Sequence, residues 1–279
     1  MRITTSKNAI LTQLRALATL TNTEIMIAET RTAQARTDAV RRELSQNAEN
    51  GRERAEAIED AIRGLGALPA VVGPAIGRIG AMVKSMFEQA QPFDEAVLGD
   101  LALEYQLLGR ATYLKALSVQ ENDRTLTDLA ERLIVAHKAT VDWLTTVLAE
   151  EALGGPAALR RTPLQSVAAL GTTVVNLPGS WIARAGDNLA DAAKQLPAHV
   201  GDLIGRGSAT KVPEADELAI EGYQDLNATD AVAAIRTLDD PEAIRAVVSF
   251  EEANKNRSTV VSAAQAHVAN IAKDTVGVS

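Results

Sequence analysis

The sequence predicts an all-α protein, and three observations lead to this fold class. Aromatic residues make up only 3% of the chain and there are 9 prolines among 279 residues, a composition that offers little material for β-strands. Apolar residues recur every three or four positions over long stretches, which is typical of helices that bury one face. The first 66 residues contain no proline. We therefore expect long amphipathic helices.

The first 66 residues predict two helices rather than one. Apolar or small residues follow one stripe from Ile10 to Ala28 and a second from Val40 to Leu65. A single helix over this range would be about 90 Å long, at 1.5 Å per residue, which is too long for a globular domain. We expect a turn near residues 35–38, with Thr37 or Asp38 as the N-cap of the second helix. The sequence LGALP at 65–69 ends that helix.

A second pair of helices is predicted between Phe93 and Leu153. The break ENDR at 121–124 is short, so the two helices should be antiparallel neighbours. Residues 65–92 are long enough to cross a bundle from end to end, which gives two hairpins joined by one long crossover. The apolar stripes of the two helices consist of Val97, Leu101, Leu108, Ala111 and Leu114, and of Leu126, Ala130, Leu133, Val141, Leu144 and Leu148.

Three ionisable residues lie on these apolar stripes. They are Glu24 in the first helix, Glu104 in the third and His137 in the fourth. Carboxylates and imidazoles inside a helical core are costly unless they are paired, hydrogen-bonded or bound to a metal ion. These residues are therefore the candidate functional site.

The run from Asn8 to Leu153 resembles the bacterial ferritin-like family. The similarity lies in the segments LTNTEIMIAE, IRGLGALP, ALEYQLLGRATYL and AERLIVAHKATVDWLTTVL. Metal-binding members supply a carboxylate from one helix of each half and a Glu-x-x-His motif from the next. The resemblance implies a ferritin-like up-down four-helix bundle with a long crossover. It also implies Glu24, Glu104 and His137 as ligands of iron or manganese.

This sequence departs from the family pattern at the remaining ligand positions. Ile134 stands three residues before His137 where the motif has Glu, and the second helix has Gly51 and Arg54 where a Glu-x-x-His would be expected. At most three of the usual six ligands are therefore present. The alternative is a structural role, in which Glu24 forms an ion pair with Arg54. Glu104 and His137 would then bond to each other, or to Tyr105 or Tyr113.

Residues 156–212 predict additional amphipathic helices. Between Pro178 and Pro197, apolar residues fall on one face of a helix, with acidic and basic residues on the others. That face could bind a lipid surface, with a tryptophan at the interface, or could pack on protein. Its candidate contact residues are Trp181, Ile182, Leu189 and Leu196. Residues 205–213 (GRGSATKVP) read as a flexible linker.

Residues 213–279 predict a small helical C-terminal module, separate from the bundle of residues 1–155. Asn227 or Thr229 should cap a helix over 230–238, and Asp240 followed by Pro241 opens the final helix. The pattern GYQDLNATDAVAAIRTL…FEEANKNRSTVVSAA is similar to a short helical module of actinobacterial proteins. We expect the module to fold as a separate piece on a tether.

Composition narrows the range of functions. The chain has no cysteine, which excludes disulfides and thiolate chemistry, and its net charge of −8 argues against nucleic-acid binding. The N-terminus does not have the apolar core of a signal peptide, so we expect a cytoplasmic protein, with peripheral membrane association as an option.

Two functions remain. The favoured one is a non-catalytic interaction protein without cofactor, which binds its own copies, a protein partner or a lipid surface. The alternative is an iron- or manganese-binding oxidoreductase or storage protein.

Overall fold

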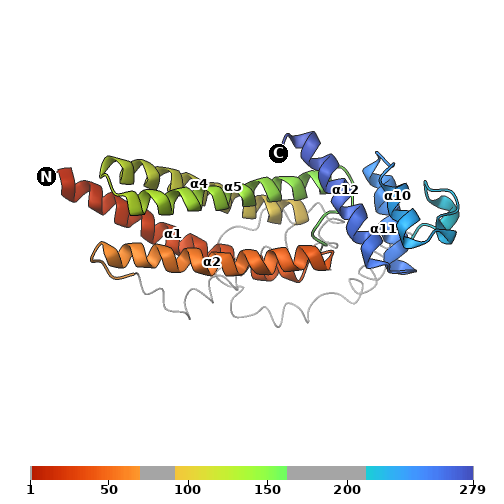
Figure 1. Cartoon of the computed structure of the whole chain (residues 1–279), viewed down its shortest axis with the longest axis horizontal. Coiled ribbons are helices and arrows are strands. Elements are labelled where there is room, and N and C mark those ends of the chain that lie inside the picture. The colour runs from red at the N-terminus through yellow and green to blue at the C-terminus, as the bar shows by residue number, and fades with distance from the viewer. Residues whose placement is uncertain (1, 70–91, 162–211, 279) are drawn as a thin grey trace, which may run out of the picture.

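Four long helices form an elongated body in the computed structural model, which describes residues 2–69, 92–161 and 212–278 (Figure 1). They are α1 (Arg2–Thr32), α2 (Asp38–Gly64), α4 (Phe93–Gln120) and α5 (Arg124–Ala152), and together we call them the helical body. Within the described ranges 78% of the residues are helical and there is no strand, which confirms the all-α class. None of the described helices is long and apolar enough to cross a membrane.

Both predicted helix breaks are confirmed. The Thr37 side chain caps α2 by accepting a hydrogen bond from the Val40 N–H at 3.2 Å. Asp123 caps α5 in the same way, since its carboxylate accepts from the Leu126 N–H at 3.0 Å. The residue before it, Asn122, has a φ of 56°, a left-handed conformation that asparagine tolerates better than most residues.

The four helices are arranged as two antiparallel pairs. α1 packs against α2 and α4 against α5, and the pairs meet mainly through α1 and α4. The end of α2 at Gly64 lies beside the start of α5 at Asp123, whereas α4 begins toward the other end of the body (Figure 1). The two ends that the predicted crossover joins therefore lie toward opposite ends of the body. The crossover itself, over 70–91, lies outside the described residues.

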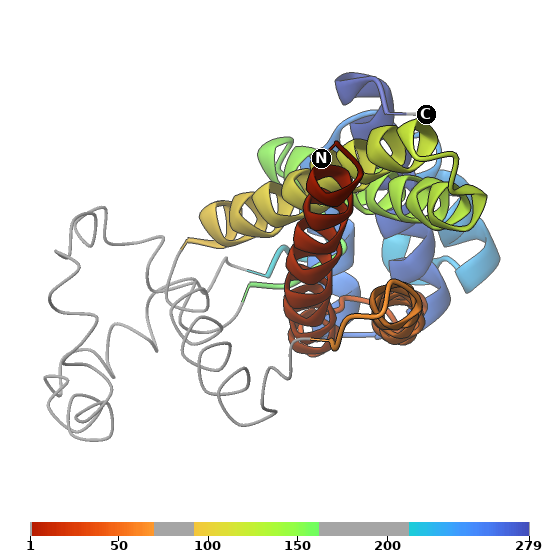
Figure 2. The same ribbon diagram turned by 90° about the vertical axis from the view of Figure 1, so that its left-hand side faces the viewer.

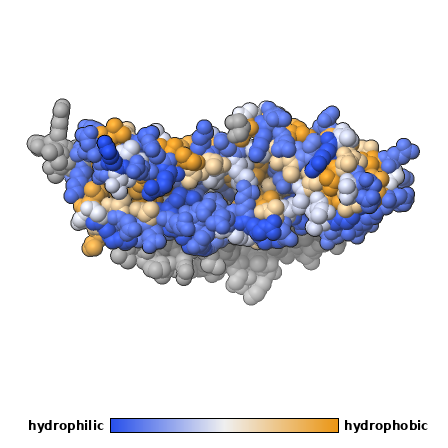
Figure 3. Space-filling view, in the orientation of Figure 1, coloured by the Kyte–Doolittle hydropathy of each residue, from blue (hydrophilic) through white to orange (hydrophobic). Residues whose placement is uncertain are grey.

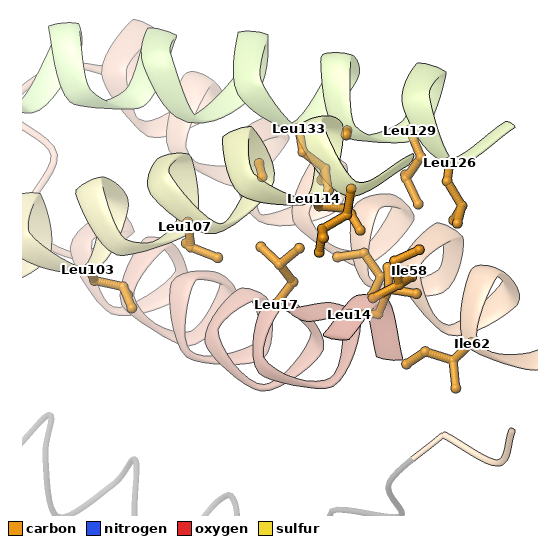
Figure 4. Packing of buried hydrophobic residues seen from close by; sticks show 14 residues of the cluster. Leu14, Leu17, Ile58, Ile62, Leu103, Leu107, Leu114, Leu126, Leu129 and Leu133 are labelled. Carbon is orange, nitrogen blue, oxygen red and sulfur yellow. The ribbon is translucent and has the colours of Figure 1, made fainter. Parts of the chain in front are cut away.

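All four helices contribute to one apolar core (Figure 4). The predicted stripes of α1, α2 and α5 are buried along most of their length. For α4 the prediction needs a correction, because Leu103 and Leu107 are buried whereas Leu101 and Leu108 are only half-buried. α4 packs against both α1 and α5, so its buried arc is wider than a single stripe and is turned relative to it.

The C-terminal module has its own apolar core, formed around Tyr223, Ile244 and Val260. It contains two 3₁₀ turns (Ala215–Glu217 and Tyr223–Asp225) and the helices α10 (Ala228–Ile235), α11 (Pro241–Ala253) and α12 (Ser258–Val276). Asn227 caps α10 and Asp240 caps α11, as predicted. The prediction of one final helix is wrong, because the chain breaks at 254–257, where Asn256 has a φ of 47°.

The C-terminal module is not detached from the helical body, which corrects the expectation of a separate piece on a tether. Helix α12 packs against α5, and the Gln265 side-chain amide donates to the Glu150 carboxylate at 3.1 Å. Arg36 and Arg160 both bond the carboxylate of Glu252. The linker predicted at 205–213 lies outside the described residues except for its last two. The amphipathic face of Trp181, Ile182, Leu189 and Leu196 lies entirely outside them.

After α5 the chain turns back onto the α1–α2 turn. The Arg160 N–H donates to the Gln34 carbonyl at 2.7 Å, and the Arg36 N–H donates to the Ala158 carbonyl at 2.9 Å. These bonds form an isolated antiparallel bridge between Ala35 and Leu159. The segment after α5 therefore closes the end of the helical body that faces the C-terminal module.

Candidate functional site

The three predicted site residues converge inside the helical body. Glu24 comes from α1, Glu104 from α4 and His137 from α5, and their side chains are 4%, 3% and 0% exposed. Each offers one ligand atom, and these atoms all lie within 4.8 Å of one another. The convergence follows from the helical period, because each residue lies on the face that its helix turns to the core.

Glu104 and His137 bond to each other. His137 Nδ1 lies 3.0 Å from Glu104 Oε2, and both side chains are buried. The other partners considered for them, Tyr105 and Tyr113, are 54% and 51% exposed. Of the two arrangements that the sequence allowed, the structure therefore has the direct carboxyl–imidazole contact.

Glu24 is paired with Arg54 from α2. Arg54 Nη2 donates to Glu24 Oε1 at 2.5 Å, and the arginine side chain is 13% exposed. One turn earlier on α2, a Cβ added at Gly51 would lie only 2.7 Å from Cγ1 of Ile25. The side chain of Ile25 therefore fills the space that a longer residue at position 51 would need. Neither position of the expected Glu-x-x-His motif on α2 offers a metal ligand.

Burial shifts the protonation of all three residues toward their neutral forms. Burial raises the pKa of Glu24 to about 7, with the nearby Glu104 adding to the rise and Arg54 opposing it. Burial likewise raises the pKa of Glu104 to about 8, against the charge of Arg54. Burial lowers the pKa of His137 to about 4, although Glu24 opposes this. Near pH 7 the cluster therefore holds a neutral imidazole and a mostly protonated Glu104 next to the Glu24–Arg54 pair.

The residues present do not fit a two-metal centre of the ferritin type. Such a centre uses four carboxylates and two histidines, whereas the part of the chain that the structure describes brings together two carboxylates and one histidine. Two buried atoms in the cluster, Glu24 Oε2 and His137 Nε2, have no hydrogen-bond partner, so a single ion could still find ligands here. That ion would have to bind beside the guanidinium of Arg54, which stays charged.

A second buried polar network adjoins this cluster and was missed from the sequence. Arg31 Nε donates to Asp100 Oδ2 at 2.8 Å, and Arg31 Nη1 donates to Gln34 Oε1 at 2.7 Å. The signal was present in the spacing, because Asp100 lies one helical turn before Glu104 and on the same face. A cavity of about 40 Å³ lies between the two networks, which is room for one or two water molecules.

A groove between α2 and α5 leads from the surface toward the cluster. The two helices make few contacts and lie apart when viewed from the end of the body (Figure 2). Two hollows of about 490 and 340 Å³ lie along this groove. The smaller one is lined by Arg54 and shares Asn47, Thr140 and Trp143 with the internal cavity. A small solute in this groove would therefore meet Arg54 before it reached His137.

Two basic side chains of the C-terminal module, His267 and Arg257, have structural partners. His267 Nε2 lies 2.8 Å from the Leu238 carbonyl. Arg257 bonds the buried carboxylate of Glu251 and also donates to the Leu226 carbonyl at 2.7 Å. His199 lies outside the described residues.

Comparisons with known proteins assign no family to the chain. No family model, no curated protein and no solved structure matches it.

Proposed function

We propose that this protein is a non-catalytic, ferritin-like interaction protein whose former metal positions now hold a structural polar core. The observation that carries the proposal is the bond between Arg54 and Glu24. It places a permanent positive charge among the three ligand-type residues, from the helix that would otherwise complete a metal site. A guanidinium does not lose its proton at physiological pH, so it opposes the binding of a divalent cation.

The cluster is suited to holding the helices in register. The Glu24–Arg54 bond joins α1 to α2, and the Glu104–His137 bond joins α4 to α5. Removing one partner of a buried ion pair such as Glu24–Arg54 typically costs about 3–5 kcal/mol, because the other partner stays buried without compensation. Leaving one partner of the uncharged Glu104–His137 bond unsatisfied costs less, about 1–3 kcal/mol. Slipping one helix along its neighbour would separate these partners and carry a similar cost.

The interaction role would be performed by the outer surfaces of the helices, in the cytoplasm or at the periphery of a membrane. Candidate partners are further copies of the chain, another protein or a lipid surface, for which the sequence offers the face of Trp181, Ile182, Leu189 and Leu196. Large exposed apolar residues of α4, described below, support contact with protein.

Metal analysis of the purified protein tests the proposal. The protein is expressed with iron and manganese supplied and is analysed by elemental mass spectrometry, alongside His137→Ala and Arg54→Met. We expect no stoichiometric metal in the wild type, and a loss of stability in Arg54→Met because Glu24 loses its partner. One iron or manganese per chain in the wild type, lost in His137→Ala, would refute the non-catalytic role.

A single-ion site is the second candidate function, with iron or manganese as cofactor. It is favoured by the three ligand atoms within 4.8 Å and by the two unpartnered atoms, Glu24 Oε2 and His137 Nε2. The two candidates differ in the expected response to Arg54→Met. A metal protein would keep or increase its metal content in this variant, whereas a structural core would only become less stable.

A further inference from the structure

Between Leu98 and Gln120 the outward face of α4 carries few charged groups, whereas Asp94 and Glu95 in its first turn are exposed. Every residue of α4 from Leu98 to Gln120 is described, and none of its exposed residues is ionisable except for the phenols of two tyrosines. Four large apolar residues are prominent on this face: Leu98, Tyr105, Tyr113 and Val119 are 45%, 54%, 51% and 56% exposed. Exposed apolar surface of this kind on a helix indicates an interaction site.

The charged residues of the same stretch are all turned elsewhere. Asp100 and Glu104 are buried in the two polar networks. Arg110 donates to a glutamine of α1 at 3.0 Å, and Lys115 pairs with a glutamate of α5 at 2.9 Å. Both bonds draw the basic groups toward the flanking helices, although the Lys115 side chain stays 43% exposed at the edge of the face.

The outward face of α2 is the opposite in character. Most of its exposed residues are charged, including Arg41, Glu49, Glu53 and Arg63, and the surface over α2 is largely hydrophilic (Figure 3). The chain as a whole is 23% charged. The difference between two helices of the same body shows that the uncharged face of α4 is a local feature rather than a property of the composition.

The α4 face also has the spacing of a coiled-coil seam. Positions 98, 102, 105, 109, 112, 116 and 119 alternate steps of four and three residues over three heptads. Large residues (Leu98, Tyr105 and Val119) alternate along this seam with small ones (Ala102, Gly109 and Ala116). At 1.5 Å per residue the seam is about 32 Å long.

We propose that α4 pairs with α4 of a second copy of this chain, antiparallel and about a two-fold axis. In one antiparallel register Gly109 lies opposite Tyr105 of the second copy, Ala116 lies opposite its Leu98, and Ala102 lies opposite its Thr112. Leu98 and Tyr105 then each meet a smaller residue, which is the condition for knobs to enter holes at close range. Val119 lies opposite Glu95 of the second copy, at the edge of the contact. The inference deepens the proposed interaction role and rests on it for its biological meaning.

A second copy is the occupant that the alternation of large and small residues along the seam favours. The chain has a net charge of −8, so two copies repel each other at long range, and a contact through the centre of this face avoids placing like charges directly opposite each other. A two-fold axis through α4 brings two such surfaces together.

The neighbouring helix α1 can widen the contact. Between residues 8 and 22, Arg15 is its single charged residue among those described as exposed, and the hydroxyls of Thr12 and Thr19 bond carbonyls of their own helix. The α4 face, about 32 Å long, and the α1 face, about 21 Å long, together cover about 530 Å² at a width of about 10 Å, which is the size of a small interface rather than of a standard one of roughly 800 Å² per partner.

The oligomeric state of the full chain tests the inference, with two glycines of α4 as a matched pair. A Cβ added at Gly109 or at Gly99 meets no atom within 4 Å, so Gly109→Glu and Gly99→Glu are both tolerated in one chain. Gly109 lies in the seam and Gly99 lies to its side. We expect a dimer in sedimentation velocity for the wild type and for Gly99→Glu. Gly109→Glu should raise the dissociation constant more than about tenfold, because the dimer would bury two unpaired carboxylates.

A mixing experiment tests the register. Tyr105→Lys alone should also weaken the dimer, whereas an equimolar mixture of the Gly109→Glu and Tyr105→Lys chains should recover it, because the new charges then lie opposite each other. A monomeric wild type, or a dimer that Gly109→Glu leaves intact, overturns the α4 interface. Dimer disruption without recovery on mixing overturns the stated register. Sedimentation tests the α4 interface and metal analysis tests the structural core, so a negative result in one experiment does not decide the other.

Discussion

Replacing Glu104 by glutamine should remove part of the pH dependence of stability. Burial raises the pKa of Glu104 to about 8 from the ordinary 4.5. Between pH 4.5 and pH 8, Glu104 is therefore protonated in the folded protein but ionised in the unfolded chain. The unfolded state binds fewer protons than the folded state in this window, so the free energy of unfolding falls as pH rises. This sign is the reverse of the usual one for a salt-bridged carboxylate.

The magnitude follows from the same shift. One proton that is bound only in the folded state changes the free energy of unfolding by about 1.4 kcal/mol per pH unit. Between pH 6.5 and pH 8.5 Glu104 passes through its folded pKa, so its contribution declines by about 2 kcal/mol. His137 does not interfere in this window, because its pKa is lowered to about 4 and its effect is confined to pH values below its ordinary 6.5. Glu24, with a pKa of about 7, adds to the same trend at the lower end.

Glutamine is uncharged at every pH, and its amide group can bond His137 Nδ1 in either tautomer, by donating from the NH₂ or by accepting at the carbonyl oxygen. We expect Glu104→Gln to be within about 1 kcal/mol of the wild type at pH 6.5 and clearly more stable at pH 8.5. Urea titrations followed by circular dichroism at both pH values give the comparison, with Glu53→Gln on the exposed face of α2 as control. Parallel losses of stability in wild type and Glu104→Gln would refute the reasoning, because they would show that Glu104 is ionised throughout.

Two further predictions concern packing and the second polar network. Gly51→Ala should destabilise the protein by about 1–3 kcal/mol in thermal denaturation, because its Cβ would lie 2.7 Å from Ile25 Cγ1. Gly99→Ala, with nothing within 4 Å of its Cβ, should stabilise it by up to about 1 kcal/mol through helix propensity. Arg31→Leu should cost about 3–5 kcal/mol in urea titrations, because Asp100 loses a buried charged partner.

The controls for these predictions are internal to the chain. Equal effects of alanine at positions 51 and 99 would contradict the close contact with Ile25. For the second network, the double variant Arg31→Leu with Asp100→Asn should lose less free energy of unfolding than the two single variants lose together, since the two residues bond each other. Additive losses would mean that the bond contributes nothing.

The long helices were predictable because each depends on local patterns. The caps at Thr37 and Asp123 lie at the breaks that the sequence indicates, since an N-cap is read from one side chain and its neighbours. The pairing of Glu104 with His137 was predictable as one of a few options, because helical periodicity places both on buried faces. The caps need no knowledge of which helix contacts which, and the pairing of Glu104 with His137 needs only the short break at 121–124, which makes their two helices neighbours.

The features that were missed depend on how the helices are placed together. The burial of Leu103 and Leu107 follows from α4 having two neighbours, which a single-helix stripe does not reveal. The Arg31–Asp100 bond joins residues 69 positions apart, and its partners could be matched only after α1 and α4 were known to be adjacent. The break between α11 and α12 carries no proline or glycine, and its stop signal is the weaker one of the asparagines at 254 and 256, which tolerate the left-handed conformation.

The bridge between Ala35 and Leu159 has a consequence for the order in which the chain folds. It joins the turn between α1 and α2 to the segment after α5, so it closes a loop of more than a hundred residues, whose entropic cost exceeds that of either hairpin. Each hairpin is held by contacts between residues that are near in sequence, so it can form early. The bridge adds no stability until both hairpins have formed. We therefore expect the bridge to form late, so that substitutions at Leu159 accelerate unfolding while leaving the rate of folding almost unchanged.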